Sequence, residues 1–200
     1  MAYADALMRF RRAAITLPTA LASAAIVAIA MGGLPRIASA LPPSRAVVNV
    51  SPTGAVRTIQ AALRVVDRGG TIIVQPGTYS DTTIVVGIPV TIIGRGWPVL
   101  DGANRRQIMT ITADSVTVRG LRFRNVGVAF TQDLAAITVV RGRDCVIADN
   151  RIENGFFGIY LQEAERCRVE GNDLRASHAR DAESGNGIHL WHSRDITIQG

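Results

Sequence analysis

A small set of side chains in this sequence could bind a metal ion. Imidazole, thioether and thiolate groups are the ligands that copper prefers in proteins. The residues of interest that offer such groups are Met109, Cys145, Cys167, His178, His189 and His192. We take the three histidines and Met109 as candidate copper ligands, with copper as a candidate cofactor. The alternative for the histidines is a solvent-facing or turn-capping role.

The two cysteines belong to a repeated segment. Residues 145–150 (CVIADN) align with residues 167–172 (CRVEGN), so cysteine, apolar positions and asparagine recur after 22 residues. Such a period, built of short alternating runs and polar turns, is typical of a parallel β-helix coil. The cysteine position is filled in other coils by Val90, Val116 and Ile196. We therefore expect Cys145 and Cys167 to be structural, as buried thiols; a disulfide and a metal-binding thiolate pair are the alternatives.

Asn150 and Asn172 occupy equivalent turn positions one coil apart. Asparagine tolerates the left-handed conformation at turns, and its side chain can hydrogen bond to its copy in the next coil. We interpret this pair as a structural ladder.

The same pattern extends over most of the chain. The first strand of each coil is anchored at Ile92, Val118, Ile147, Val169 and Ile198. The second strand is anchored at Phe123, Ile152 and Leu174, and the third at Ile137, Ile159 and Ile188. Three short strands per coil, each alternating between inward and outward residues, predict an all-β fold. The predicted architecture is a right-handed parallel β-helix over residues 71–200.

The connection between the second and third strands varies in length. It is expanded over residues 124–136 and 175–187 and short over residues 153–158. Insertions that gather on one edge of a solenoid often form its binding face. The partner-binding residues that we expect there are Phe130, Gln132, Asp133, His178, Arg180, Asp181 and Glu183. The alternative is that both loops are tolerated, solvated insertions. A second candidate surface is an outward column of Met109, Thr138, Tyr160 and His189.

The N-terminal residues 1–40 read as a signal peptide. Three arginines precede an apolar run that ends in an Ala-Ser-Ala cleavage site at residues 38–40. An uncleaved membrane anchor is the alternative. Both place the remainder outside the cytoplasm.

The segment between the signal peptide and the first coil is expected to cover the open end of the solenoid. Residues 41–52 contain three prolines and are interpreted as an extended linker. The spacing of Val56, Ile59, Leu63 and Val66 predicts a capping helix over residues 53–70. Gly69 and Gly70 are expected to end that helix.

Composition and charge narrow the classes of function. The net charge of +6 comes from arginine alone, and it is too evenly spread to indicate nucleic-acid binding. Enzymes with this architecture need clustered carboxylates for acid–base chemistry. In the predicted register no two carboxylates stack on one face of adjacent coils, so we predict that the protein is not an enzyme.

Several segments resemble the NosD family. They are residues 58–63 (TIQAAL), 75–79 (QPGTY), 96–102 (GWPVLDG), 158–161 (GIYL) and 185–191 (GNGIHLW). The resemblance implies a periplasmic β-helix subunit that acts with an ABC-type ATPase and a membrane partner. That complex supports assembly of the copper centre of nitrous-oxide reductase, so the reductase and a copper chaperone are the other implied partners. The alternative, based on architecture alone, is a carbohydrate-active β-helix of the lyase or hydrolase type.

The last residue aligns with Gly171, which is followed by an asparagine. We therefore expect a full reading frame to continue with asparagine and further coils.

Overall fold

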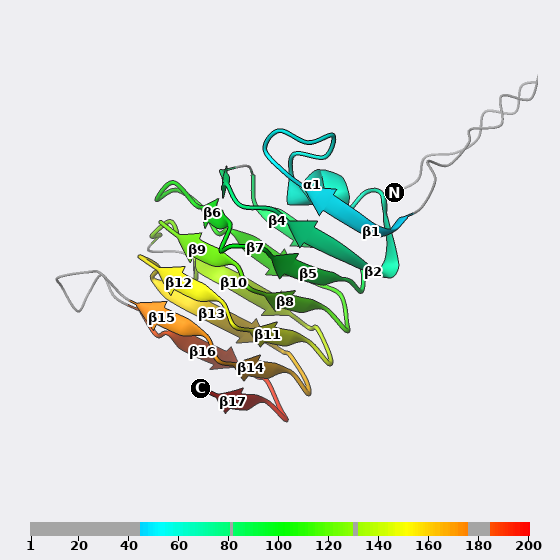
Figure 1. Cartoon of the computed structure of the whole chain (residues 1–200). Coiled ribbons are helices and arrows are strands. Elements are labelled where there is room, and N and C mark those ends of the chain that lie inside the picture. The colour runs from blue at the N-terminus through cyan, green and yellow to red at the C-terminus, as the bar shows by residue number, and fades with distance from the viewer. Residues whose placement is uncertain (1–44, 81, 130–131, 176–184) are drawn as a thin grey trace, which may run out of the picture. The chain divides into compact units, whose positions relative to one another are not determined.

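The computed structural model describes residues 45–80, 82–129, 132–175 and 185–200. In these residues the chain winds through successive coils, and each full coil gives one strand to each of three parallel sheets (Figure 1). The predicted all-β solenoid is confirmed.

The three sheets contain the following strands. Sheet 1 consists of β1 (Arg45–Val50), β2 (Val66–Val74), β5 (Thr91–Gly94), β8 (Thr117–Arg119), β11 (Val146–Ala148), β14 (Arg168–Glu170) and β17 (Thr197–Gln199). Sheet 2 consists of β3 (Thr78–Tyr79), β6 (Val99–Asp101), β9 (Arg122–Arg124), β12 (Arg151–Glu153) and β15 (Asp173–Arg175). Sheet 3 consists of β4 (Ile84–Val86), β7 (Met109–Ile111), β10 (Ala135–Val140), β13 (Phe157–Gln162) and β16 (Ile188–Trp191).

The register between coils follows the predicted anchors. In sheet 1, Ile147 pairs with Val118 on one side and with Val169 on the other. Sheet 2 aligns Phe123, Ile152 and Leu174, and sheet 3 aligns Ile137, Ile159 and Ile188. Because side chains alternate along a strand, this register turns one set of apolar residues inward in every coil.

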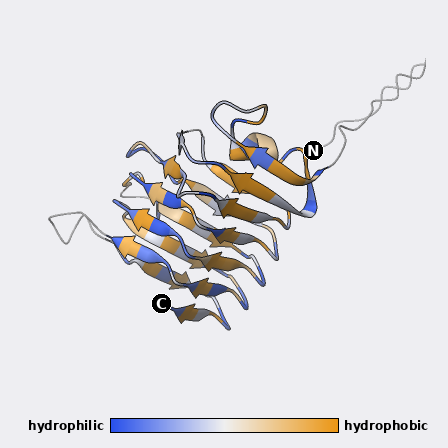
Figure 2. Ribbon diagram, in the orientation of Figure 1, coloured by the Kyte–Doolittle hydropathy of each residue, from blue (hydrophilic) through white to orange (hydrophobic). Residues whose placement is uncertain are grey.

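The interior of the solenoid is a continuous apolar core. The predicted inward column of Val90, Val116, Cys145 and Cys167 is buried, and Ile196 packs against the same core. Phe123 is among the largest fully buried side chains. Figure 2 shows the hydrophobic colour along the strands of successive coils. Burial of this apolar surface is the main stabilising term of the fold.

The end of the solenoid before the first full coil is covered differently from the prediction. Residues 45–50 are not linker, because they form β1 and pair with β2 at the edge of sheet 1. The helix predicted over residues 53–70 is also wrong in extent, since α1 covers only Ile59–Ala62. The β-branched Val65 and Val66 follow α1 and favour a strand, and β2 begins at Val66. Gly69, with a φ of 78°, lies inside β2 rather than ending a helix.

The single turn of α1 nevertheless covers part of the open end. The hydroxyl of Thr58 accepts a hydrogen bond from the Ala61 N–H at 2.9 Å and so caps the helix. Ile59 and Ala62 are buried against the core. The side chain of Gln60 accepts a hydrogen bond from the N–H of Val85 in β4, the end strand of sheet 3, at 2.9 Å. This hydrogen bond gives a partner to a backbone N–H at the strand edge that would otherwise be unpaired.

The predicted asparagine ladder is present at the corner between sheets 1 and 2. The side-chain oxygen of Asn172 accepts hydrogen bonds from the backbone and side-chain nitrogens of Asn150, both at 3.0 Å. Asn150 in turn donates to the carbonyl of Val118 and accepts from the N–H of Leu121. The left-handed residues precede the asparagines; one of them is Asp149, with a φ of 51°.

The predicted signal peptide, residues 1–40, lies outside the described residues. None of the helices in the part of the chain that the structure describes is long and apolar enough to cross a membrane.

Candidate functional site

The corner between sheets 2 and 3 is the irregular part of the solenoid. The strand bounds leave residues 125–134 between β9 and β10, residues 154–156 between β12 and β13, and residues 176–187 between β15 and β16. The long and short connections therefore lead into three neighbouring strands of sheet 3, as the spacing predicts. Among the expected partner-binding residues, Gln132 and Asp133 are exposed just before β10. The others lie outside the described residues, and they are Phe130, His178, Arg180, Asp181 and Glu183.

Aromatic rings gather on the outer side of sheet 3 beside this corner. The ring of Phe157 lies 5.8 Å from that of Tyr160 and 5.1 Å from that of His189, measured between ring centroids. Tyr160 and His189 are also 5.1 Å apart, and Phe156 packs edge-on against Phe157 at 4.7 Å. Such separations are typical of favourable aromatic pairs. We call Phe156, Phe157, Tyr160 and His189 the aromatic cluster.

The register explains half of the aromatic cluster. Thr138, Tyr160 and His189 are direct neighbours on β10, β13 and β16, as predicted for the outward column. Phe157 has the same parity as the inward Ile159, yet its ring belongs to the cluster and not to the main core. Sequence alternation therefore misses Phe157. The signal that could have found it is the adjacent pair of phenylalanines at the short connection, in a chain with few aromatic residues.

Polar groups surround the aromatic cluster. A ring nitrogen of His189, Nδ1, is hydrogen bonded to the amide of Asn186 at 3.1 Å. Burial raises the pKa of the Tyr160 hydroxyl, and the negative charge of Asp133 raises it further. Tyr160 therefore stays protonated and able to donate at neutral pH. Thr138 is buried although it faces outward, and its hydroxyl is the one buried side-chain polar atom in the described ranges without a hydrogen-bond partner.

The candidate copper ligands that the structure describes, Met109, His189 and His192, do not all share one site, and His178 lies outside the described residues. Met109 pairs with Ile137, not with Thr138, so it faces inward and is fully buried. It lies on the opposite face of sheet 3 from His189, and the assignment of Met109 to the outward column and to a shared copper site is wrong. His192 packs on Trp191 at 4.8 Å, in the turn after β16. Within the described residues, no three His, Cys, Asp or Glu side chains come together as a metal site.

The two cysteines are free thiols in the core, as expected, and not a disulfide. Both are fully buried. The Cys145 thiol donates to the carbonyl of Ala113 at 3.5 Å, and the Cys167 thiol to that of Glu165 at 3.4 Å. The neighbouring thiol of Cys167 and burial together raise the pKa of Cys145. A protonated thiol is a poor nucleophile and metal ligand, so Cys145 fits a structural role, and the full burial of both side chains agrees with that role for the pair.

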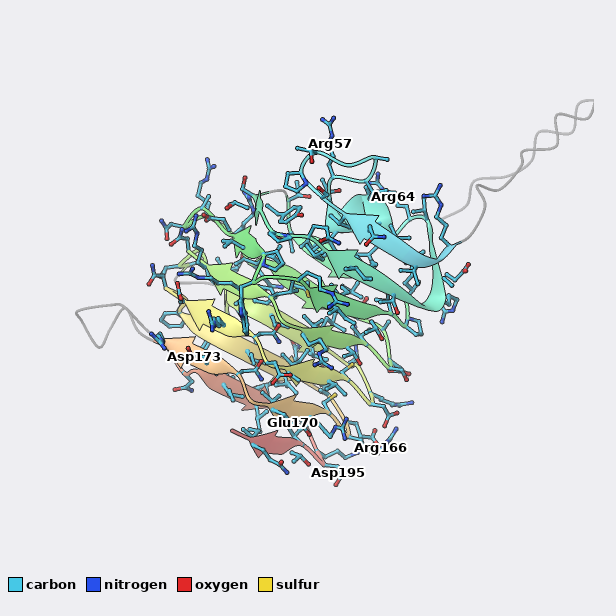
Figure 3. The ribbon with its side chains drawn as sticks, viewed as in Figure 1. Arg57, Arg64, Arg166, Glu170, Asp173 and Asp195 are labelled. Carbon is cyan, nitrogen blue, oxygen red and sulfur yellow. The ribbon has the colours of Figure 1, made fainter. Side chains whose placement is uncertain are left out.

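Arginine neutralises many of the carboxylates that the structure describes. Arg166 binds Asp144 through two hydrogen bonds, of 2.9 and 3.0 Å, and Arg175 binds Asp173 in the same way. Arg166 and Asp173 are labelled in Figure 3. These hydrogen bonds lower the pKa of both aspartates. A general acid needs the opposite shift, toward neutral pH.

A smaller exposed surface lies at the corner between sheets 1 and 2. Trp97 is in the turn between β5 and β6, and the guanidinium carbon of Arg151 lies 3.9 Å from its ring centroid. Arg95, Arg119 and Asp149 line an open hollow together with Trp97.

The family model described as "right handed beta helix region" matches residues 99–200. This match covers half of the chain, and the chain therefore belongs to the right-handed β-helix family.

One curated relative gives a more particular likeness. The chain is 33% identical over 103 residues to the probable ABC transporter binding protein NosD of Pseudomonas aeruginosa. The match covers 50% of this chain and 24% of NosD, so the chain spans about a quarter of the length of that relative.

One solved structure has the same fold, and a second is a weaker match. A candidate glycosyl hydrolase from Parabacteroides merdae superposes with a TM-score of 0.52 at 10% identity, covering 78% of this chain and 96% of that one. A pectin methylesterase from Aspergillus niger has a TM-score of 0.31 at 17% identity, covering 78% of this chain and 68% of that one. At these identities the likeness concerns architecture alone.

Proposed function

We propose that the protein is a non-catalytic, periplasmic β-helix scaffold of the NosD type. In this proposal it binds the ATPase and membrane subunits of an ABC-type transporter and supports assembly of the copper centre of nitrous-oxide reductase. The observation that carries the proposal is the partial match to NosD, which is named a probable ABC transporter binding protein. The predicted signal peptide supports export to the periplasm.

The geometry of sheet 3 supports a docking role. Its outer side carries the aromatic cluster, and two expanded connections lead into the strands on either side of β13. Aromatic side chains beside exposed polar groups are typical of protein interfaces. Asp133 and Asn186 supply such polar groups on either side of the cluster. We propose that this side of the molecule contacts the partners.

In this proposal, copper is the metal that is delivered to the reductase. His189 and His192 are the candidate ligands in the described residues, but one ring nitrogen of His189 is already hydrogen bonded. We propose that the protein holds its partners, including a copper chaperone, and that the partners transfer the metal.

A carbohydrate-active β-helix is the second candidate. The observation in its favour is the presence of aromatic rings on the outer face of a parallel sheet, where sugar rings could stack. The arginine-paired carboxylates Asp144 and Asp173 weaken this candidate, because acid–base cleavage needs a carboxyl group with a raised pKa. We therefore favour the scaffold.

The test is to delete the gene in its own host and to measure copper in purified nitrous-oxide reductase. We expect the reductase to be made but to lack copper, and the full-length protein to restore it. Retention of the transporter subunits on the tagged protein is the second measurement. Full copper loading in the deletion strain would refute the proposal, whereas loss of growth on a polysaccharide would favour the second candidate.

A further inference from the structure

An exposed tryptophan at the corner between sheets 1 and 2 has an unusual backbone conformation. Trp97 has a φ of 58°, in the left-handed region, and follows Gly96 with a φ of 64°. Large side chains rarely adopt this conformation, because the Cβ atom crowds the backbone. The ring is nevertheless partly exposed, with 37% of the residue accessible to solvent.

One arginine side chain contacts this ring, and two others line the hollow beside it. The guanidinium carbon of Arg151 lies 3.9 Å from the Trp97 centroid, a cation–π distance. Arg122, the neighbour of Arg151 in sheet 2, is neutralised by Glu153 at 2.7 Å. In the part of the chain that the structure describes, neither Arg151 nor Arg95 has a carboxylate at ion-pair distance. Two positive charges are therefore left beside the indole.

The hollow next to Trp97 is built from backbone and charged side chains. Arg95, Arg119 and Asp149 line it with the indole, and glycines form its floor. A Cβ atom on Gly94 would stand 2.1 Å from the carbonyl oxygen of the next coil, so only glycine allows this close approach. Arg119 and Asp149 are 3.6 Å apart, and more than half of each side chain is exposed. Such an exposed pair is weak, so Arg119 is free to bind another anion.

We propose that this Trp97 hollow binds an acidic segment of a partner protein. Guanidinium groups bind carboxylates through two parallel hydrogen bonds, and tryptophan and arginine are the residues most enriched at binding hot spots. An open, shallow site suits an extended chain better than an enclosed small molecule. The site has a net positive charge, because it has three arginines and one carboxylate. The residues are Arg95, Arg119, Arg151 and Asp149, and their net charge gives the site its preference for carboxylates. This inference rests on the proposed scaffold function.

The experiment is a titration of the full chain with a hexaglutamate peptide, and hexaglutamine serves as the neutral control peptide. A Trp191→Phe background leaves Trp97 as the only fluorescent indole of these 200 residues. We expect the fluorescence of Trp97 to change with hexaglutamate only, and the effect to weaken with salt. The variant Arg95→Gln with Arg119→Gln should raise the Kd by about tenfold.

The matched control removes the same charge elsewhere. Arg57 and Arg64 are exposed beside α1 (Figure 3), and replacing both with glutamine should leave the Kd within about twofold. An equal loss in this control would overturn the inference, because binding would then follow net charge. Tighter binding of an oligogalacturonate than of hexaglutamate would also overturn it, in favour of an acidic carbohydrate.

A retention assay separates this inference from the proposed function. If the transporter subunits retain the wild-type protein and the Arg95→Gln, Arg119→Gln variant equally, the inference fails and the scaffold function stands. If they do not retain the wild-type protein, the scaffold function fails. Selective loss of retention in the variant supports both.

Discussion

The corner between sheets 1 and 2 and the corner between sheets 2 and 3 turn the same chain in different ways. At the first, Asn150 and Asn172 repeat one set of hydrogen bonds from coil to coil. At the second, the connections differ in length, and aromatic rings collect beside them. The comparison teaches that the turns with paired asparagines stabilise the stack, whereas connections of variable length, and turns without the asparagine such as the one that carries Trp97, can acquire a binding role.

The irregular corner nevertheless has a fixed base. The carboxylate of Asp101 accepts hydrogen bonds from Ala103, Arg124 and Asn125, at 2.8 to 3.1 Å for the shortest contact with each. Asn125 in turn accepts a hydrogen bond from Asn154 in the next coil at 3.3 Å. The first expanded connection and the short connection thus begin from a pinned backbone. Chain length can vary beyond this point at little energetic cost.

Of the two corners, the regular corner is expected to show the larger effect on stability. Asn150→Ala would leave buried partners unpaired, among them the carbonyl of Val118 and the N–H of Leu121. Loss of buried hydrogen-bond partners costs about 3 kcal/mol in unfolding free energy, measured by urea denaturation. The matched control is Asn186→Ala at the irregular corner, which is exposed and should cost less than about 0.5 kcal/mol. Equal effects of the two changes would contradict the comparison.

A smaller effect is expected from the aromatic cluster. Phe157→Ala removes the ring that contacts Tyr160 and His189, and should cost about 2 kcal/mol in unfolding free energy. Phe123→Ala, in the main core, should cost about 4 kcal/mol. Calorimetry of both variants measures the difference. If Phe157→Ala is the more damaging change, the cluster is part of the core and not a satellite.

The smallest expected effect is on the pH dependence of stability, and it comes from the carboxyl group of Asp101. Burial alone would raise the pKa of Asp101. Hydrogen bonds from Ala103, Asn125 and Arg124 outweigh burial and lower this pKa below its ordinary value of 3.8. A lowered folded-state pKa stabilises the fold above pH 3.8, and this contribution is lost as the pH falls through the folded-state value. We expect Asp101→Asn to remove about 1 kcal/mol of unfolding free energy at pH 6 and almost none at the acid end. A constant difference across this range would exclude the carboxylate as the cause.

The regular parts of the fold could be predicted because each coil repeats the same alternation. Ile147 and its partners in neighbouring coils were placed by spacing alone, and the structure confirms them. Met109 was assigned one position away from its true register, and in a strand a slip of one residue exchanges the inner and outer faces. The short α1 was overextended because Val66 fits a helical spacing as well as a strand.

The aromatic cluster could be predicted only in part. Tyr160 and His189 follow from the register, but the ring of Phe157 departs from alternation at the start of β13. The long hydrogen bonds at this point, 3.4 Å from Phe157 and from Gly158, mark a locally loosened ladder that no sequence pattern reveals. The left-handed conformation of Trp97 could not be predicted from the sequence either, because glycine and asparagine favour that backbone conformation and tryptophan does not.

The most direct test of the docking role is to shorten both expanded connections, residues 125–134 and 176–187, to the length of residues 154–156. The measurement is the amount of transporter subunit retained by the variant, with the unfolding free energy as the check on folding. We predict a change in stability below about 1 kcal/mol, because the strands stay paired, together with loss of most of the retained partner. Full retention by the folded, doubly shortened protein would contradict the claim that this corner is the docking surface.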